Sequence, residues 1–513
     1  MNGMETYASL TPWLAVGISL IAVLPILLSE RNPNLRESWT FLAAFIKFGL
    51  IFSLVPGALR GETATWTLFD LAPGVSFSLA ADPLGVYFAL VASVLWIVTS
   101  AYSVGYMRGH GEAKQTRYFA SFAISVSSTI GIAFADNLLT FVVFYELLTL
   151  ATYPLVIHKE SPEAVRAGRM YLAYALTAGL VLLAGTAWIF FRTGTLDFQA
   201  GGIALDGSFS AGEMKVLFLL LLTGVGVKSG IMPLHSWLPA AMVAPTPVSA
   251  LLHAVAVVKS GAFGVIRMTG FVFGPETMRD YGLDILLAGF ATATILLASI
   301  IAMQQDNLKR RLAYSTVGHL SYMALGAALL APGALLGGVL HLSAHAFMKI
   351  TLFFCAGAIY VHAHRTEISQ LDGLGKVMPW TFGAFTIGAL GLAGIPPLNG
   401  FISKWWLAVG SIESGRDWAL LVLLLSGLLN AGYFFPIVIR AFFRPRPTEA
   451  DPAQPAFPSS EASRWMVVPL CVTACLSVVF GIFPNFPLPF FELASQIAED
   501  VFGSSPVSLV SDP

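Results

Sequence analysis

Residues 224–261 read GVGVKSGIMPLHSWLPAAMVAPTPVSALLHAVAVVKSG. The stretch places lysines and four prolines between two apolar runs of membrane-spanning character. A buried ammonium group is costly at membrane depth unless it is paired or hydrated. Prolines there free backbone groups that must face protein or a water-filled cavity. The stretch therefore predicts interrupted helices beside buried cations, a pattern typical of an ion pathway.

Composition places the chain in a membrane. Of its 513 residues, 56% are hydrophobic and 11% are charged, whereas soluble domains are about one-quarter charged. We therefore expect an all-α, polytopic membrane protein. The net charge of −1 argues against a nucleic-acid partner. Cys355, Cys471 and Cys475 lie in apolar segments without metal-ligand spacing, so we expect them to serve packing.

Apolar runs of about 20 residues recur along the chain. The first run follows an acidic start without Lys or Arg, so we interpret it as a retained span and not as a signal peptide. The runs predict about 14 transmembrane helices, at residues 10–29, 39–59, 82–104, 118–135, 137–157, 168–191, 214–232, 247–270, 282–304, 310–331, 333–361, 379–410, 418–440 and 465–484.

The basic residues agree with this layout, because Lys and Arg gather in loops on the inner side of a membrane. The odd-numbered loops and their span edges hold 17 of the 28 Lys and Arg residues, and the even-numbered loops hold 6. An even number of spans with the odd loops inside predicts both termini on the outer face. The expected location is the inner (plasma) membrane of a bacterial or archaeal cell.

The remaining five basic residues lie inside spans: Lys47, Lys228, Lys259, Lys349 and Lys404. Among the acidic residues, Glu146 alone lies well inside a span. One carboxylate cannot hold five buried lysines in ion pairs, so some of the lysines must share water, change partners or spend time neutral. Lys47 fits no pattern in the sequence.

Two short motifs occur twice and indicate an internal repeat. The sequence GIMPL at 230–234 resembles GIPPL at 394–398, and DNL at 136–138 recurs at 306–308. Separations of about five spans, an odd number, invert the second copy relative to the first. Inverted repeats with interrupted helices at matching positions are typical of transporters, and the interruptions point to the site.

Glu146 and Lys228 are the first candidate pair. If their spans pack together, each charge lowers the cost of burying the other, and an arriving proton changes that balance. A static buried salt bridge is the structural alternative. Lys259 lies midway along its run without an evident carboxylate partner, and Lys404 follows the second interruption. For both lysines, snorkelling to an interface is the alternative to a role in proton transfer.

Histidines 253, 319, 341 and 345 lie inside spans and suit a proton relay. His341, His345 and Lys349 follow one another at four-residue spacing on one helix face. The two histidines also fit a metal or haem site, and any one of the four fits a hydrogen-bonded structural role. The sequence contains no Walker loop, no dinucleotide fingerprint and no cysteine cluster, so no redox or hydrolytic site, cofactor or metal is expected.

Four segments resemble the antiporter-like, proton-conducting subunits of respiratory complex I, membrane-bound hydrogenases and Mrp-type sodium/proton antiporters. They are the 224–261 stretch, DNLLTFVVFYELLTLATYPLV at 136–156, HLSAHAFMKITLFFCAG at 341–357 and GIPPLNGFISKW at 394–405. The resemblance implies 14 helices with two inverted five-helix repeats, in which helices 7 and 12 are broken. It places helices 1–3 at 1–117, the repeats at 118–270 and 282–442, an inner-side connector at 443–464, and helix 14 with a tail at 465–513.

The resemblance also assigns roles to the candidate residues. Glu146 and Lys228 resemble the family's glutamate–lysine pair, and Lys259 resembles its bridging residue. His319, His341 and His345 resemble the central relay, and Lys404 resembles the terminal lysine of the second half. His253 and Lys349 are secondary relay candidates.

The function implied is proton translocation within a multi-subunit Mrp-type monovalent cation/proton antiporter, in which this chain resembles the D-type component. Other membrane subunits are the expected partners, and one of them could carry Na⁺. Two alternatives stay open: a proton-pumping subunit of a complex I-like oxidoreductase or membrane-bound hydrogenase, and a non-conducting scaffold in an ion or bicarbonate uptake complex. The residues leave open which cation is exchanged and in which direction.

Overall fold

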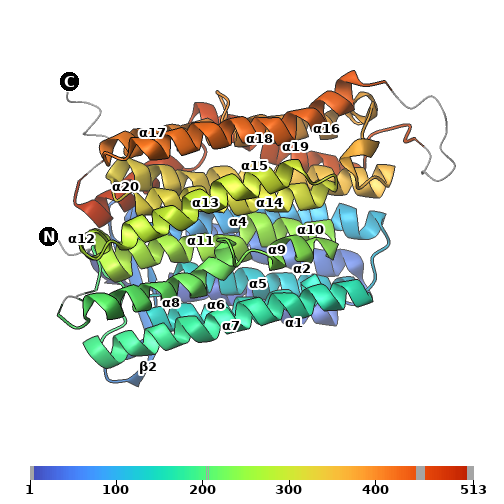
Figure 1. Ribbon diagram of the computed structural model, residues 1–513. Helices are drawn as coiled ribbons and strands as arrows, with labels where there is room; N and C mark the ends of the chain where they lie inside the picture. Colours follow the sequence, from blue (N-terminus) through green and yellow to red (C-terminus); the bar gives the residue numbers. More distant parts are fainter. Residues whose placement is uncertain (1–4, 204, 206, 446–456, 505, 507–513) are drawn as a thin grey trace.

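The computed structural model describes residues 5–203, 205, 207–445, 457–504 and 506. Long helices lie side by side with roughly parallel axes, and β2, α12 and α20 are all at the same end of the bundle (Figure 1). The first half contains α1 (Thr11–Leu28), α2 (Pro33–Phe52), α3 (Val55–Ala58), α4 (Pro83–Gly109), α5 (Gln115–Ala133), α6 (Leu138–Val156), α7 (Pro162–Thr193), α8 (Ala211–Ser229), α9 (Trp237–Ala240), η1 (Ala241–Val243), α10 (Thr246–Ala250), η2 (Leu251–Val255), α11 (Val257–Arg267), η3 (Met268–Phe273) and α12 (Gly274–Asp280).

The second half repeats the pattern of long helices joined by short connections. It contains α13 (Leu283–Met303), α14 (Leu308–Ala328), α15 (Pro332–Ala363), η4 (Ile368–Gln370), η5 (Leu374–Lys376), α16 (Pro379–Ala393), α17 (Asn399–Glu413), α18 (Asp417–Phe443), α19 (Arg464–Ile482) and α20 (Phe490–Phe502).

Each predicted span overlaps a helix or a run of helices. Within the described residues, ten helices or helix runs are long and apolar enough to cross a membrane. The helices α5, α8 and α14 are of similar length but carry more polar side chains, and α16 is shorter. The helical membrane fold is thereby confirmed, while the number fourteen stays a prediction.

A small sheet departs from the purely helical expectation. Strands β1 (Thr6–Ala8), β2 (Thr63–Ala72) and β3 (Val75–Ala81) form a sheet in the order β1-β2-β3. The β2–β3 pair is antiparallel, and Gly74 lies in the connection at φ 79°, a conformation that glycine adopts without strain. Alternating Thr, Trp and Phe side chains in β2 favour a strand. The sheet lies at one end of the bundle, which we call the sheet end (Figure 1).

Two pairs of elements reproduce the predicted repeat. Asn137 caps α6 by accepting from the Thr140 N–H, and Asn307 caps α14 by accepting from the Arg310 N–H. Each asparagine also forms a bridge with a residue 60 positions later, to Asp197 in the first case and Glu367 in the second. Helices α7 and α15 both contain 32 residues. These matches support the predicted repeats, whose boundaries stay a prediction.

Both expected interruptions occur. Helix α8 ends before Gly230, at φ 69°, and α16 ends before Gly394, at φ 91°. Glycine ends helices in this way because it adopts the left-handed conformation without a Cβ clash. The run from α10 to α12, expected as one plain span, contains two π-helical segments, η2 and η3, which are typical of functional sites.

The carboxyl-terminal tail forms a helix. Residues after about Pro484 are at most amphipathic by their sequence, and residues 490–502 form the amphipathic helix α20, whose apolar side is buried. Of the predicted inner-side connector 443–464, residues 446–456 lie outside the described residues.

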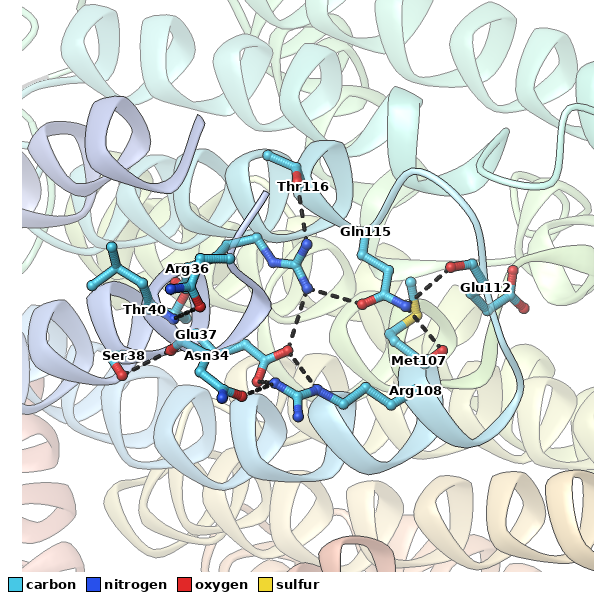
Figure 2. Close-up of polar contacts among 12 residues, drawn as sticks. Asn34, Arg36, Glu37, Ser38, Thr40, Met107, Arg108, Glu112, Gln115 and Thr116 are labelled. Atoms are coloured by element: carbon cyan, nitrogen blue, oxygen red, sulfur yellow. Dashed lines mark hydrogen bonds and ion pairs between the residues drawn. The ribbon is translucent and has the colours of Figure 1, made fainter. Parts of the chain in front are cut away.

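Opposite the sheet end lies the basic end, which we define by the connections 29–32, 110–114, 157–161 and 304–307. Figure 2 shows a polar cluster there that joins α2 to α4 and α5. Glu37 is paired with Arg36 at 3.3 Å and with Arg108 at 2.5 Å. Arg36 also donates to Gln115 and Thr116. The cluster fixes the amino-terminal end of α2 against the start of α5.

Glu160 provides a test of the basic end by pH. Hydrogen bonds from Lys114 and Arg117 lower the pKa of this carboxyl group from 4.5 to about 2. Because the folded pKa is depressed, the stabilisation is present above about pH 4.5 and is lost as the pH falls toward 2. We expect Glu160→Gln to lower the thermal midpoint slightly at pH 7 and by less as the pH falls, with the difference gone below about pH 2.

The measurement is thermal unfolding in detergent at a series of pH values. Glu163→Gln is the matched control, because Glu163 forms no ion pair within the described part of the chain. A midpoint difference that stays constant down to pH 2 would contradict the assigned contacts.

Candidate functional site

Lys228 is held at the interruption after α8. It is fully buried and is the last residue but one of the helix. Its ammonium group donates to the Tyr145 carbonyl of α6 and lies 3.4 Å from the centroid of the Tyr145 ring. Trp237, beyond the interruption, donates from Nε1 to the Val227 carbonyl at 2.8 Å. The broken helix therefore points a cation at α6.

Glu146 follows Tyr145 directly but does not join Lys228 in an ion pair within 4 Å in the described structure. Its carboxylate packs on Gly179 of α7, where a Cβ atom would lie 2.0 Å from Oε1. Oε1 is buried, and the described residues provide no hydrogen-bond partner for it. The structure thus places Lys228 of α8 against the residue that precedes Glu146 in α6, without an ion pair between the two among the described residues, and the role of the pair stays a prediction.

Gly179 provides a test of this carboxylate that changes no charge. We expect Gly179→Ala to displace the Glu146 side chain and to lower proton flux about 10- to 100-fold, because transfer rates fall steeply with small misplacements. The measurement is proton flux in vesicles containing the assembled complex.

Gly289→Ala in α13 is the matched control, since nothing lies within 4 Å of its added methyl group. Equal flux in the two variants would show that the position of Glu146 does not limit transfer.

Lys259 and three of the predicted histidines meet in the centre of the bundle. The Lys259 amine lies 2.9 Å from His345 Nδ1. His319 Nδ1 lies 3.0 Å from His341 Nε2, and His341 Nδ1 lies 2.9 Å from the Ser403 hydroxyl. The rings of His319 and His345 have centroids 5.4 Å apart. All four predicted residues are almost completely buried.

Lys404 connects to this cluster through a helix end. Its ammonium group donates to the Leu392 carbonyl at 2.7 Å and to Ala393 at 3.2 Å. The last carbonyls of a helix have no partner within the helix, so the interruption after α16 leaves these oxygens free to accept. Asn430 of α18 donates to the same Leu392 carbonyl at 3.2 Å and lies 3.3 Å from His319 Nε2.

Lys349 reaches the cluster by a second branch. It donates to the Ser315 hydroxyl at 2.8 Å. The Tyr433 hydroxyl oxygen lies 2.9 Å from the same Ser315 hydroxyl oxygen, and it donates its proton to Asn430 Oδ1 at 2.5 Å. The sequence-based candidates did not include Asn430, Tyr433, Ser315 or Ser403. Asn430 and Tyr433 could have been found, because they are polar residues at helical spacing within an apolar span.

His253 stands apart from this network. It lies in the π-helical segment η2, fully buried, with its ring 5.0 Å from that of Phe353. Neither ring nitrogen has a hydrogen-bond partner among the described residues. The structure therefore does not join His253 to the other predicted histidines.

The helical bundle is that of a polytopic membrane protein. A network of buried lysine and histidine side chains, which can take up and release protons, lies in its interior. The family model described as NADH:quinone oxidoreductase/Mrp antiporter, TM, matches residues 135–429. The chain belongs to this family, which confirms the resemblance drawn from its motifs.

Relatives span several kinds of complex. The chain is 30% identical to NADH-quinone oxidoreductase subunit N of Desulforudis audaxviator, over 90% of this chain and 95% of the relative. It is 31% identical to hydrogenase-4 component B of Escherichia coli, over 86% and 69%. It is 28% identical to the A-type component of the Na(+)/H(+) antiporter of Alkalihalophilus pseudofirmus, over 92% and 61%.

Solved structures share the fold. A chain of the Mrp complex from Dietzia sp. superposes with a TM-score of 0.85 at 22% identity, covering 98% of this chain and all of that chain. A chain of the membrane-bound sulfane sulfur reductase, an archaeal respiratory membrane complex, superposes with a TM-score of 0.83 at 22% identity, over 96% and 98%.

Proposed function

We propose that this chain is a proton-translocating membrane subunit of a multi-subunit Mrp-type monovalent cation/proton antiporter. The observation that carries the proposal is the buried network from Lys259 to Lys404. Lys259 bonds to His345, and the His345 ring lies 5.4 Å from the His319 ring, measured between ring centroids. His319 in turn bonds to His341 and to Asn430, and Asn430 and Lys404 donate to the same helix-end carbonyl. Imidazole and amine groups can each take up and release a proton, which suits a relay.

In this proposal protons arrive at Glu146 and Lys228, pass Lys259 and the histidines, and leave near Lys404. Lys228 is bound to a backbone carbonyl and not to a carboxylate, so its ammonium group can shift toward Glu146 as the charge there changes. Movement of the Lys228 ammonium group between the Tyr145 carbonyl and Glu146 would couple proton transfer in the first half of the molecule to transfer in the second half. Lys349 would serve as a secondary relay through Ser315 and Tyr433.

The proposed assembly places this chain beside other membrane subunits, one of which would carry Na⁺. Large apolar side chains are exposed along α18, including Leu421, Leu424 and Leu428. Such a surface suits lipid or a neighbouring helix. The basic end would face the inside of a bacterial or archaeal cell membrane, with both termini outside, because Lys and Arg collect at that end.

A redox-driven complex is the second candidate. It is favoured by the NADH-quinone oxidoreductase subunit N of Desulforudis audaxviator, which matches over 90% of this chain and 95% of its own length. The same proton path would then be driven by electron transfer on other subunits.

The deciding experiment measures proton flux in vesicles that hold the assembled complex. A Na⁺ or K⁺ pulse that drives proton flux supports the antiporter, whereas flux that requires a reductant and quinone supports the second candidate. Unchanged proton flux in Lys228→Ala would indicate that the proton path lies in a neighbouring chain of the complex and that this chain is a scaffold.

A further inference from the structure

Lys47 lies outside the network described above, in the amino-terminal helices. It is fully buried in α2 and is among the largest completely buried side chains of the molecule. Its amine donates to the Ser19 hydroxyl of α1 at 2.7 Å and lies 5.5 Å from the centroid of the Trp96 ring of α4. Lys47 therefore bridges three helices at a depth where lysine is rare.

The surroundings of Lys47 are polar but uncharged. The Val16 carbonyl accepts hydrogen bonds from Ser19 at 3.4 Å and from Ser127 of α5 at 2.7 Å. Trp96 Nε1 is buried and has no hydrogen-bond partner within the described residues. A small group of hydroxyl, indole and carbonyl dipoles thus surrounds one amine.

No countercharge reaches this amine from the described helices packed against α2, which are α1, α4 and α5. Helix α1 contains no titratable side chain. On α2, Glu37 lies ten residues away, about 15 Å along the helix, and is held by Arg36 and Arg108. The remaining charged groups of α4 and α5 are Arg108 and Arg117, both at the basic end.

The tyrosines of α4 and α5 are engaged elsewhere. Tyr87 bonds with Ser343, and Tyr102 donates to the Phe354 carbonyl. Tyr118 bonds with Ser103, and Tyr106 with Thr246. None of these groups offers Lys47 a negative charge.

Packing alone does not explain a lysine here. A methionine of similar length would fill the same space without desolvating a charge, and replacement of buried charges by apolar groups is often neutral or stabilising. The charged form gains the Ser19 hydroxyl and the face of the Trp96 ring, while burial favours the neutral form. Opposing effects of this kind suit a group that changes its protonation state.

We propose that Lys47, Ser19 and Trp96 form a proton-binding site separate from the relay of the two repeats. The neutral amine accepts one proton on its lone pair, one N–H bond forms, and no other bond changes. The resulting ammonium group is held by the Ser19 oxygen and the indole face. This proposal does not depend on the proposed function, because it concerns residues that the relay does not use.

The test is a direct titration of Lys47 in the assembled complex, in lipid, with ¹⁵N-labelled lysine observed by solid-state NMR. The Lys47 resonance is the one lost in Lys47→Met. We expect it to move reversibly between the ammonium and amine positions between about pH 5 and 11, a range that brackets the ordinary lysine value. A resonance that keeps one position throughout that range would overturn the proposal.

Two further variants keep the test decisive if Lys47→Met fails to assemble. Ser19→Ala removes the bonded hydroxyl and should move the pH of the transition, which also identifies the resonance. Thr40→Ala, on the same buried face of α2, is the control and should leave the transition unchanged, because Thr40 bonds to the Arg36 carbonyl of its own helix. Equal transitions in the two variants would contradict the site. Lys228→Ala should titrate as the wild type does, whatever its proton flux.

Discussion

Lys228→Ala is expected to reduce proton flux by about 100-fold or more in vesicles containing the assembled complex, the loss typical of removing a positioned proton-transfer group. Lys228 is fully buried, and its ammonium group is fixed by the Tyr145 carbonyl and ring on the turn that carries Glu146. Alanine removes the only cation that the interrupted helix α8 directs at α6 within the described residues. A proton reaching Glu146 would then find no basic group to continue the transfer.

The control for this variant is Lys215→Ala, which removes an exposed lysine from the same helix. Both variants must be compared at matched assembly, measured by the amount of complex recovered per vesicle. Flux above about one-third of the wild-type value in Lys228→Ala, a loss far below that of a proton-transfer group, would remove this lysine from the path.

Arg267→Ala is expected to lower the free energy of unfolding by about 3–5 kcal/mol, the usual consequence of leaving one partner of a buried ion pair alone. Arg267 ends α11 and forms a bidentate pair with Asp82, which caps α4 by accepting from the Gly85 N–H. The side chains are 3% and 8% exposed. The guanidinium carbon also lies 4.6 Å from the centroid of the Phe271 ring.

A paired replacement separates charge from packing. Arg267→Met with Asp82→Asn removes both charges and retains much of the volume, so we expect it to lose less stability than Arg267→Ala alone. The measurement is denaturant or thermal unfolding in detergent, with Arg279→Ala as a control outside the pair. Wild-type stability in Arg267→Ala would mean that solvent reaches Asp82 and compensates for the loss.

The sequence was most informative about features that depend on hydropathy and backbone chemistry. Apolar runs located the long helices, and the repeated Gly-Ile-x-Pro-Leu motif located the interruptions at Gly230 and Gly394. Both signals are local, since a span must be apolar in lipid and a glycine must end the helix where the chain turns.

Contacts between distant segments could not be predicted in the same way. Asp82 and Arg267 lie at predicted span edges, and nothing in either segment reveals the other. The Asn430 and Tyr433 links to His319 and Ser315 depend on how α18 packs on α14. The contact of Glu146 with Gly179 depends on the rotation of α6 against α7. Each requires tertiary packing that a single sequence does not encode locally.

The strands at residues 63–81 are difficult to predict for a different reason. Alternating polar and apolar residues in β2 are visible in the sequence, but the segment lies between two strong spans and reads as an ordinary loop. Its partner β1 precedes the first span, so the pairing joins segments separated by two long helices.

Helices α7 and α15 are equal in length, so their positions can be matched, and the two halves differ in the charge found at one matched position. Gly179 lies 17 residues after Pro162, and Lys349 lies 17 residues after Pro332, so the two occupy equivalent positions. In the first half this position receives a carboxylate from the preceding helix, and in the second half it supplies an amine to Ser315. A duplicated scaffold thus carries an acid in one copy and a base in the other. The two halves therefore match in backbone architecture but differ in the sign of the charge that their side chains can carry at this position.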